Sequence, residues 1–207
     1  MKKLIKVSTL LFAGLMMLSF KLINPYGYKP GDVARDFKLK NINGKTVALA
    51  DYKDAKGFIV VFTCNHCPFS KAYEQRIIDL DKKYAAKGFP VIAINPNDKN
   101  VEPEDSYDNM VANAKTKNFT FPYLYDESQE IAAAYGATRT PHVFVLQKTA
   151  KGNIVKYIGA IDDNTDEPGA VTKRYVEDAV NELLNGKEVT VASTKALGCS
   201  IKWKKSE

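Results

Sequence analysis

The chain has 207 residues, of which 45% are hydrophobic and 26% are charged, a composition typical of one soluble domain. A chain of this length buries enough apolar surface to fold without disulfide staples. The formal net charge is +6, but Lys2, Lys3, Lys6 and Lys21 lie near the N-terminus, which leaves 26 basic against 24 acidic residues elsewhere. A body so nearly neutral excludes an extended nucleic-acid-binding surface, and we expect no nucleic-acid partner.

Residues 1–22 have the pattern of a secretory signal peptide or an N-terminal membrane anchor. Lysines follow Met1, and residues 7–20 form an uncharged, largely apolar run, shorter than the roughly 20 apolar residues that cross a bilayer. The pattern leaves open whether the segment is cleaved or stays as a membrane tether. We expect export to the cell envelope, either to the periplasm or tethered to the membrane and facing outside the cytoplasm, where disulfide chemistry takes place.

A single domain is expected over residues 23–188, followed by a basic C-terminal tail over residues 189–207. Near the start of this domain, Asn43-Gly44 lies between two short strand-like runs, and Asn-Gly in that setting predicts an N-terminal β-hairpin.

The middle of the domain begins with a β-α-β pattern. Residues 57–62 are a continuous apolar run, as in a strand that is buried on both faces of a parallel sheet. Apolar residues at three- and four-residue steps from Phe69 to Tyr84 predict an amphipathic helix, and Gly88 suits its end. Residues 89–94 then form a second buried strand, and the crossover between two such strands is right-handed.

The rest of the domain alternates helices and strands. Pro103 suits the first position of a helix, and Gly152-Asn153 turns the chain between two strands of an antiparallel hairpin. The expected elements are a helix after Pro103, a strand at residues 119–125, a helix from residue 126 to 136, strands at residues 142–146 and 154–158, and a helix at residues 170–184. This order indicates an α/β fold.

Cys64 and Cys67 form a C-x-x-C motif between the apolar strand and the amphipathic helix. Unpaired N–H groups at a helix N-terminus favour a thiolate, so we expect a lowered pKa and a nucleophilic sulfur at Cys64. Cys67, one turn further on, is placed to close a disulfide with it. Half of a zinc site, an inert structural disulfide and two buried hydrophobic residues remain alternatives.

The sequence resembles the thioredoxin superfamily, and within it the redoxin or peroxiredoxin-like branch related to alkyl hydroperoxide reductases. The motifs that carry this resemblance are residues 60–68, residues 124–126, residues 134–136 and Thr140-Pro141 before a hairpin. The resemblance implies a thioredoxin-like fold, in which helices flank a central mixed β-sheet.

The resemblance also implies roles for residues near the cysteines. Pro141 would be a cis-proline beside them, which would leave the backbone of Thr140 free to pair with an extended substrate. His66 matches the middle histidine of disulfide-forming members, where it stabilises the thiolate and raises the reduction potential. Thr63 and Phe58 stand where thioredoxin has a tryptophan and a buried aspartate, so the resemblance does not extend to a buried carboxylate base.

These patterns predict a thiol–disulfide oxidoreductase without a cofactor. Cys64 would attack a disulfide, and Cys67 would resolve the mixed disulfide that forms. We expect protein disulfides or thiols as substrates, an additional redox partner, and a monomeric protein.

A thiol-dependent peroxidase is the first alternative. Peroxiredoxins place a threonine three residues before the reactive cysteine and a proline four residues before that threonine. If Cys67 were the reactive cysteine, Cys64 and Val60 would occupy those positions. Arg139 could still stabilise a thiolate, and Cys199 could act as a distant resolving thiol, although we expect Cys199 to be a free thiol in a mobile tail.

A copper- or zinc-binding module is the second alternative. Cys64, Cys67, His66 and His142 would supply thiolate and imidazole ligands. A strand histidine with satisfied hydrogen bonds is the commoner role for His142, so we expect no metal site.

Overall fold

Strand β4 (Gly57–Phe62) lies at the centre of the molecule, and all six of its residues are buried. The computed structural model describes residues 27–205. In it, β4 pairs in parallel with β5 (Val91–Asn95) and antiparallel with β8 (His142–Thr149). The expected buried strand and the β-α-β unit that follows it are confirmed.

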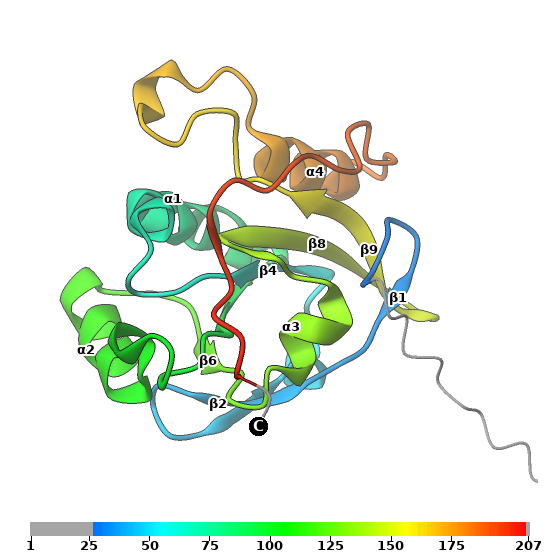
Figure 1. The fold of residues 1–207 in the computed structure, drawn as a ribbon. Coiled ribbons are helices and arrows are strands. Elements are labelled where there is room, and N and C mark those ends of the chain that lie inside the picture. Colours follow the sequence, from blue (N-terminus) through cyan, green and yellow to red (C-terminus); the bar gives the residue numbers. More distant parts are fainter. Residues whose placement is uncertain (1–26, 206–207) are drawn as a thin grey trace, which may run out of the picture.

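Eight strands form a mixed sheet in the order β1-β9-β8-β4-β5-β6-β2-β3 (Figure 1). The other strands of this sheet are β1 (Val33–Ala34), β2 (Lys38–Asn41), β3 (Thr46–Ala48), β6 (Tyr123–Tyr125) and β9 (Gly152–Gly159). Two further strands, β7 (Arg139–Thr140) and β10 (Cys199–Ser200), lie outside it. The helices are α1 (Pro68–Tyr84), α2 (Tyr107–Lys117), α3 (Glu130–Tyr135) and α4 (Tyr175–Leu184). The expected hairpin is β2–β3, and β8–β9 is the expected antiparallel pair.

The two faces of the sheet carry separate apolar clusters because side chains alternate along a strand. In β4, Ile59 and Val61 join the cluster that contains residues of α1, α2 and α4, whereas Phe58, Val60 and Phe62 join the cluster that contains residues of α3. The helices therefore cover both faces of the sheet (Figure 1). The expected α/β, thioredoxin-like architecture is confirmed.

Some element boundaries differ from the expectations. Pro103 begins a 3-10 helix that ends at Asp105, and α2 starts only at Tyr107. The last helix starts at Tyr175 rather than at residue 170, because Pro168–Ala170 forms a separate 3-10 turn. Phe69 was expected on the buried face of α1, but it is 39% exposed.

The C-terminal tail packs against the domain. Residue 193 forms a bridge with β9, and β10 pairs with β7 in a second, two-stranded sheet. In Figure 1 the tail, drawn in red, runs from the side of α4 towards α3. The predicted export segment at residues 1–22 lies outside the described residues, and none of the helices within residues 27–205 is long and apolar enough to cross a membrane.

The burial of His142 predicts a pH dependence of the stability of the fold. It begins β8, is 7% exposed, and its ring centroid lies 4.9 Å from that of Phe144. Burial lowers the pKa of His142 from 6.5 to about 4. The unfolded chain therefore binds a proton more readily than the folded chain between these values, and folded-state stability falls as the pH falls below 6.5.

We expect His142→Phe to remove this acid sensitivity. On lowering the pH from 7 to 5, the wild-type protein should lose about 2 kcal/mol more unfolding free energy than the variant, because other titrating groups are common to both. Urea unfolding at the two pH values measures the difference. Equal losses in the two proteins would contradict a buried, neutral imidazole.

Candidate functional site

The C-x-x-C motif lies in the loop between β4 and α1. Thr63, which is buried, continues the sheet by donating its N–H to the carbonyl of Ile94 at 2.9 Å. Cys67 is the N-cap residue of α1 and Pro68 is its first residue, a position at which the missing N–H is not needed. The helix therefore begins at Pro68 with Cys67 as its N-cap, and Cys64 lies before the helix rather than at its start as expected.

Asp105 holds this loop in place, although it is 39 residues away from His66 in sequence. Its side chain is fully buried. One carboxylate oxygen accepts the N–H groups of Asn65 and His66 at 2.7 and 3.1 Å, and the other accepts Nδ1 of His66 and Nδ2 of Asn97, both at 2.6 Å. Four donors to one carboxylate fill its acceptor sites. Asp105 was not predicted from the sequence, where its only signal is an acidic residue in the turn after Pro103.

Cys64 is a free thiol and is 3% exposed. Its Sγ lies 3.2 Å from Oγ1 of Thr140, 3.7 Å from Oγ of Ser70 and 3.6 Å from Nδ1 of His66. Burial raises the pKa of Cys64, and the charge of Asp105 adds to this effect, whereas hydrogen bonds with Thr140, the Cys67 backbone and Ser70 lower it. The expected lowered pKa is wrong for this arrangement because desolvation outweighs these hydrogen bonds.

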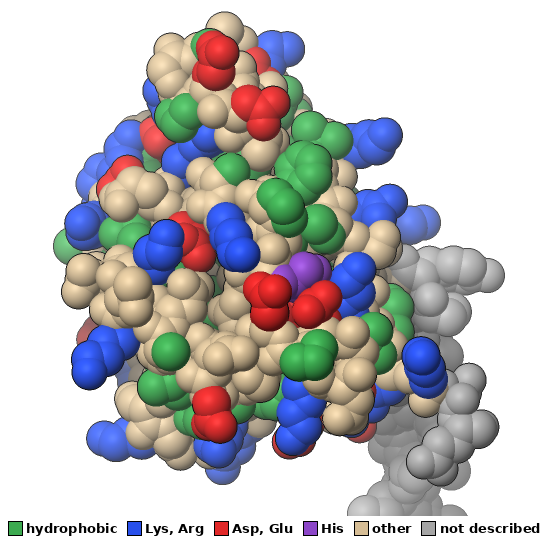
Figure 2. Space-filling model, turned by 60° about the vertical axis from the view of Figure 1, so that its left-hand side comes forward, with side chains coloured by type: hydrophobic (Ala, Val, Ile, Leu, Met, Phe, Trp, Pro, Cys, Tyr) green, Lys and Arg blue, Asp and Glu red, His purple; other side chains and the backbone are tan. Residues whose placement is uncertain are grey.

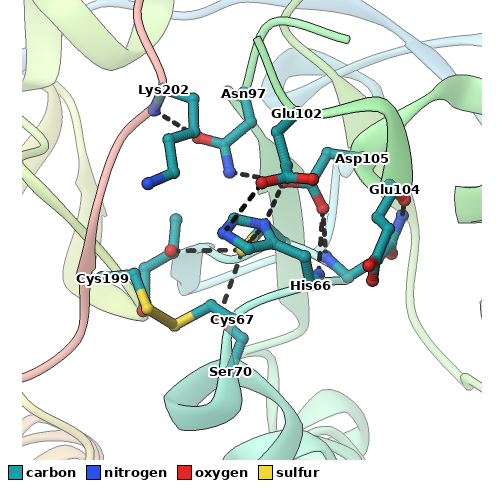
Figure 3. A network of polar contacts seen from close by, with 12 residues as sticks. His66, Cys67, Ser70, Asn97, Glu102, Glu104, Asp105, Cys199 and Lys202 are labelled. Carbon is teal, nitrogen blue, oxygen red and sulfur yellow. Dashed lines mark hydrogen bonds and ion pairs between the residues drawn. A yellow bond between two sulfur atoms is a disulfide. The ribbon is translucent and has the colours of Figure 1, made fainter.

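Cys67 forms a disulfide with Cys199, with the two Cα atoms 6.0 Å apart. The expectation of a free Cys199 in a mobile tail is therefore wrong, and so is the expectation that Cys64 is the partner of Cys67 in the disulfide seen here. The two residues are separated by 132 positions, a pairing that spacing alone cannot reveal. Figure 3 shows the disulfide between the start of α1 and the tail.

Thr140 contacts both reactive sulfurs. Its Oγ1 lies beside Sγ of Cys64, and its carbonyl oxygen lies 3.2 Å from Sγ of Cys67. The peptide bond between Thr140 and Pro141 is cis, as the resemblance implies. Strand β7, which contains Thr140, pairs with β10, so that Cys199 lies opposite Thr140.

His66 lies between two carboxylates. Its Nδ1 carries the proton, because the partner of this nitrogen at 2.6 Å is Oδ2 of Asp105, and its Nε2 lies 3.8 Å from Oε2 of Glu102. Figure 3 shows the ring next to both acidic side chains. In Figure 2, histidine surface is visible beside acidic side chains, with basic and hydrophobic side chains around them. His66 therefore lies beside Cys64, but the orientation of its ring is set by Asp105.

Arg139 and His142 were also considered as site residues from the sequence. Arg139 directs Nη1 to Oγ of Ser200 at 2.5 Å, so it contacts the tail. Among the described residues, one group of possible metal ligands contains Cys64, His66 and Asp105, with ligand atoms within 4.8 Å of one another. Neither His142 nor Cys67 belongs to that group, and the oxygens of Asp105 are already occupied by hydrogen bonds.

Comparison with known proteins identifies a matching family and several named relatives. The AhpC/TSA family matches residues 30–157. The thiol-disulfide oxidoreductase ResA of Geobacillus thermodenitrificans is 26% identical over 124 residues, which are 58% of this chain and 65% of that protein. A putative peroxiredoxin of Mycobacterium tuberculosis is 24% identical over 135 residues, which are 65% of this chain and 79% of that protein. The chain thus spans slightly less than two thirds of the first of these relatives.

Solved structures show the fold independently. An uncharacterized conserved protein from Geobacillus kaustophilus is 38% identical, with a TM-score of 0.80 over 87% of this chain and 95% of that one. The thioredoxin domain of a thiol-disulfide oxidoreductase from Bacteroides vulgatus is 16% identical, with a TM-score of 0.56 over 77% of this chain and 100% of that one. The resemblance found in the sequence is confirmed: the chain has a thioredoxin-like fold and belongs to the AhpC/TSA family.

Proposed function

We propose that the protein is a thiol–disulfide oxidoreductase of the cell envelope that uses Cys64 and Cys67. The family match and the curated relatives support a redox enzyme of the thioredoxin type. The export pattern of residues 1–22 supports the location. Cys64 is the nucleophile, Cys67 is the resolving residue, and His66 tunes the thiol pair.

The convergence of both sulfurs on Thr140 carries this proposal. The side chain of Thr140 contacts Sγ of Cys64, and its backbone carbonyl contacts Sγ of Cys67. The same residue belongs to β7, whose edge already accepts an extended strand. A client strand on that edge would place its own sulfur next to both cysteines, because strand pairing fixes the register of side chains.

The reaction is an exchange of disulfide bonds. A thiol reductant first opens the Cys67–Cys199 disulfide and is itself oxidised to a disulfide, which leaves Cys67 and Cys199 as thiols. The thiolate of Cys64 then attacks one sulfur of a client disulfide, a new S–S bond forms, and the other client sulfur leaves as a thiolate that takes a proton. The thiolate of Cys67 then attacks Sγ of Cys64, and the second client sulfur leaves. Two electrons pass from the protein to the client, and the reverse sequence oxidises a client dithiol with the same atoms.

A trapped intermediate tests the nucleophile. We expect Cys67→Ser combined with Cys199→Ser to leave Cys64 as the only thiol and to accumulate a mixed disulfide with a disulfide-containing protein such as insulin, because no residue can resolve it. Non-reducing electrophoresis and peptide mapping detect the adduct. The matched control, Cys64→Ser combined with Cys199→Ser, keeps Cys67 as its one thiol. Adduct formation should fall at least about a hundredfold, because the proposed nucleophile is replaced by a serine hydroxyl and Cys67, which is fully buried, acts only as the resolving residue.

Other patterns of adduct formation would contradict Cys64 as the nucleophile. If the protein with Cys64 alone forms no adduct while the control does, Cys67 is the attacking residue. If neither forms an adduct, exchange chemistry at this site is excluded.

The charge of Asp105 provides a second test. With Cys67 and Cys199 replaced by serine, Asp105→Asn should lower the pKa of Cys64, because the carboxylate that raises it becomes neutral while an amide oxygen still accepts hydrogen bonds. The ultraviolet absorbance of the thiolate, followed against pH, measures the shift. Glu104→Gln is the matched control, because the neighbouring Glu104 side chain is 68% exposed and should not change the titration. An unchanged or higher pKa in the Asp105 variant would contradict the assigned role.

The peroxiredoxin relative makes peroxidase activity a second candidate. The raised pKa of Cys64 keeps it as a thiol near neutral pH. This slows its reaction with peroxide and with disulfides alike, because the thiolate is the reactive form in both. We expect the fully reduced protein to consume hydrogen peroxide slowly at pH 7, with a rate that rises about tenfold per pH unit below the pKa of Cys64. Peroxide consumption, with Cys64→Ser as the control, measures this rate, and rapid turnover independent of pH would favour the peroxidase.

A further inference from the structure

The tail occupies the strand edge that the proposed function assigns to a client. Cys199 lies opposite Thr140 and Ser200 opposite Arg139 in the β10–β7 pairing. Gly198 precedes this strand, and a Cβ atom at Gly198 would lie only 2.3 Å from the carbonyl oxygen of Thr140. The close approach of the two backbones therefore requires glycine at this position.

The residues after Cys199 bind to the domain through specific contacts. Ile201 is 4% exposed and belongs to the apolar cluster that contains α3. Lys202 donates its N–H to Oδ1 of Asn97 at 2.8 Å, and its carbonyl accepts the N–H of Asp98 and Nε2 of Gln129, both at 2.9 Å. Docking of the tail is thus a folded interaction and not merely a consequence of the disulfide.

The tail and the C-x-x-C loop share one hydrogen-bond network. Asn97, which binds the backbone of Lys202, also donates Nδ2 to Asp105, and Asp105 binds His66 and the loop backbone. Figure 3 shows this continuous set of contacts from the tail to the histidine. Release of the tail would remove one of the partners that orient Asn97, and through it Asp105.

These contacts lead to an inference that rests on the proposed function. We propose that Cys199 is a third redox-active cysteine, and that residues 198–204, through the pairing of β10 with β7, form an intramolecular segment that covers the client edge until Cys64 displaces Cys199 from Cys67. The structure holds the covered form, in which Cys64 is the free thiol. In the uncovered form, Cys64 and Cys67 form the disulfide, and Cys199 is the free thiol on a released tail.

The conversion balances without an external oxidant or reductant. Cys64 loses its proton, and its thiolate attacks Sγ of Cys67. The Cys64–Cys67 bond forms as the Cys67–Cys199 bond breaks, and Cys199 leaves as a thiolate that takes up a proton. One disulfide and one thiol are present before and after, so the two forms are isomers at the same oxidation level.

The tail competes with clients because it belongs to the same chain. A tethered strand acts at an effective concentration of the order of millimolar, so a dilute client displaces it only when its own contacts with the β7 edge are strong. A client that binds the uncovered form draws the isomers towards that form. The tail therefore selects clients by their affinity for the strand edge as well as by their sulfur chemistry.

Two glycine variants test the strand. Gly198→Val should push the tail away from Thr140 while leaving all three cysteines in place, whereas Gly169→Val is a matched control because a Cβ atom there has no neighbour within 4 Å. Each protein is oxidised to one disulfide, quenched in acid with alkylation of the free thiol, and mapped by mass spectrometry. We expect Cys67–Cys199 in the wild type and the control, and a ratio of Cys64–Cys67 to Cys67–Cys199 at least about tenfold higher in Gly198→Val.

Exchange rates separate this inference from the proposed function. Cys199→Ser keeps the Cys64–Cys67 pair and should react with a client dithiol, here reduced insulin, at least about tenfold faster than the wild type, because the tail is then held on the edge by its noncovalent contacts alone and a client displaces it more readily. If Cys199→Ser reacts no faster, and the wild type contains Cys64–Cys67 with Cys199 free, the covering role is wrong while the oxidoreductase function stands. If Cys199→Ser shows no exchange at all, the proposed function itself fails.

Discussion

The site depends on a buried carboxylate. Asp105 is fully buried, and its two oxygens accept hydrogen bonds from two backbone N–H groups of the C-x-x-C loop, from His66 and from Asn97. A buried charge is stable only when such donors replace water. The geometry of the loop, the orientation of His66 and one link between the loop and the tail, through Asn97, therefore depend on this carboxylate.

The same charge opposes ionisation of the neighbouring thiol. Cys64 is buried close to Asp105, and both effects raise its pKa. Hydrogen bonds with Thr140, Ser70 and the Cys67 backbone act in the other direction but do not reverse the shift. The covered form is therefore a resting arrangement of the site, in which the attacking sulfur is close to its target but largely protonated.

Local patterns in the sequence predicted the central strand–loop–helix unit, and the family resemblance supplied the thioredoxin-like fold. The apolar run of β4 and the three- and four-residue steps of α1 depend on neighbouring residues, so the strand–loop–helix unit and its C-x-x-C motif were predictable. The roles of Asp105 and Cys199 were not predictable from local patterns. Asp105 contacts His66, which is 39 residues away, and Cys199 bonds to Cys67, which is 132 residues away. The raised pKa of Cys64 was also missed, since burial of this residue depends on the whole assembly rather than on its place near a helix.

Because the chain has three cysteines, one thiol stays free when one disulfide forms, and the position of that thiol has a chemical consequence. In the structure the leftover sulfur is Cys64, which is 3% exposed. A solvent-accessible thiolate in an oxidising compartment progresses to sulfenic and then to irreversible sulfinic and sulfonic acids, or it crosslinks two chains. Burial of this sulfur as a protonated thiol shields it from both fates.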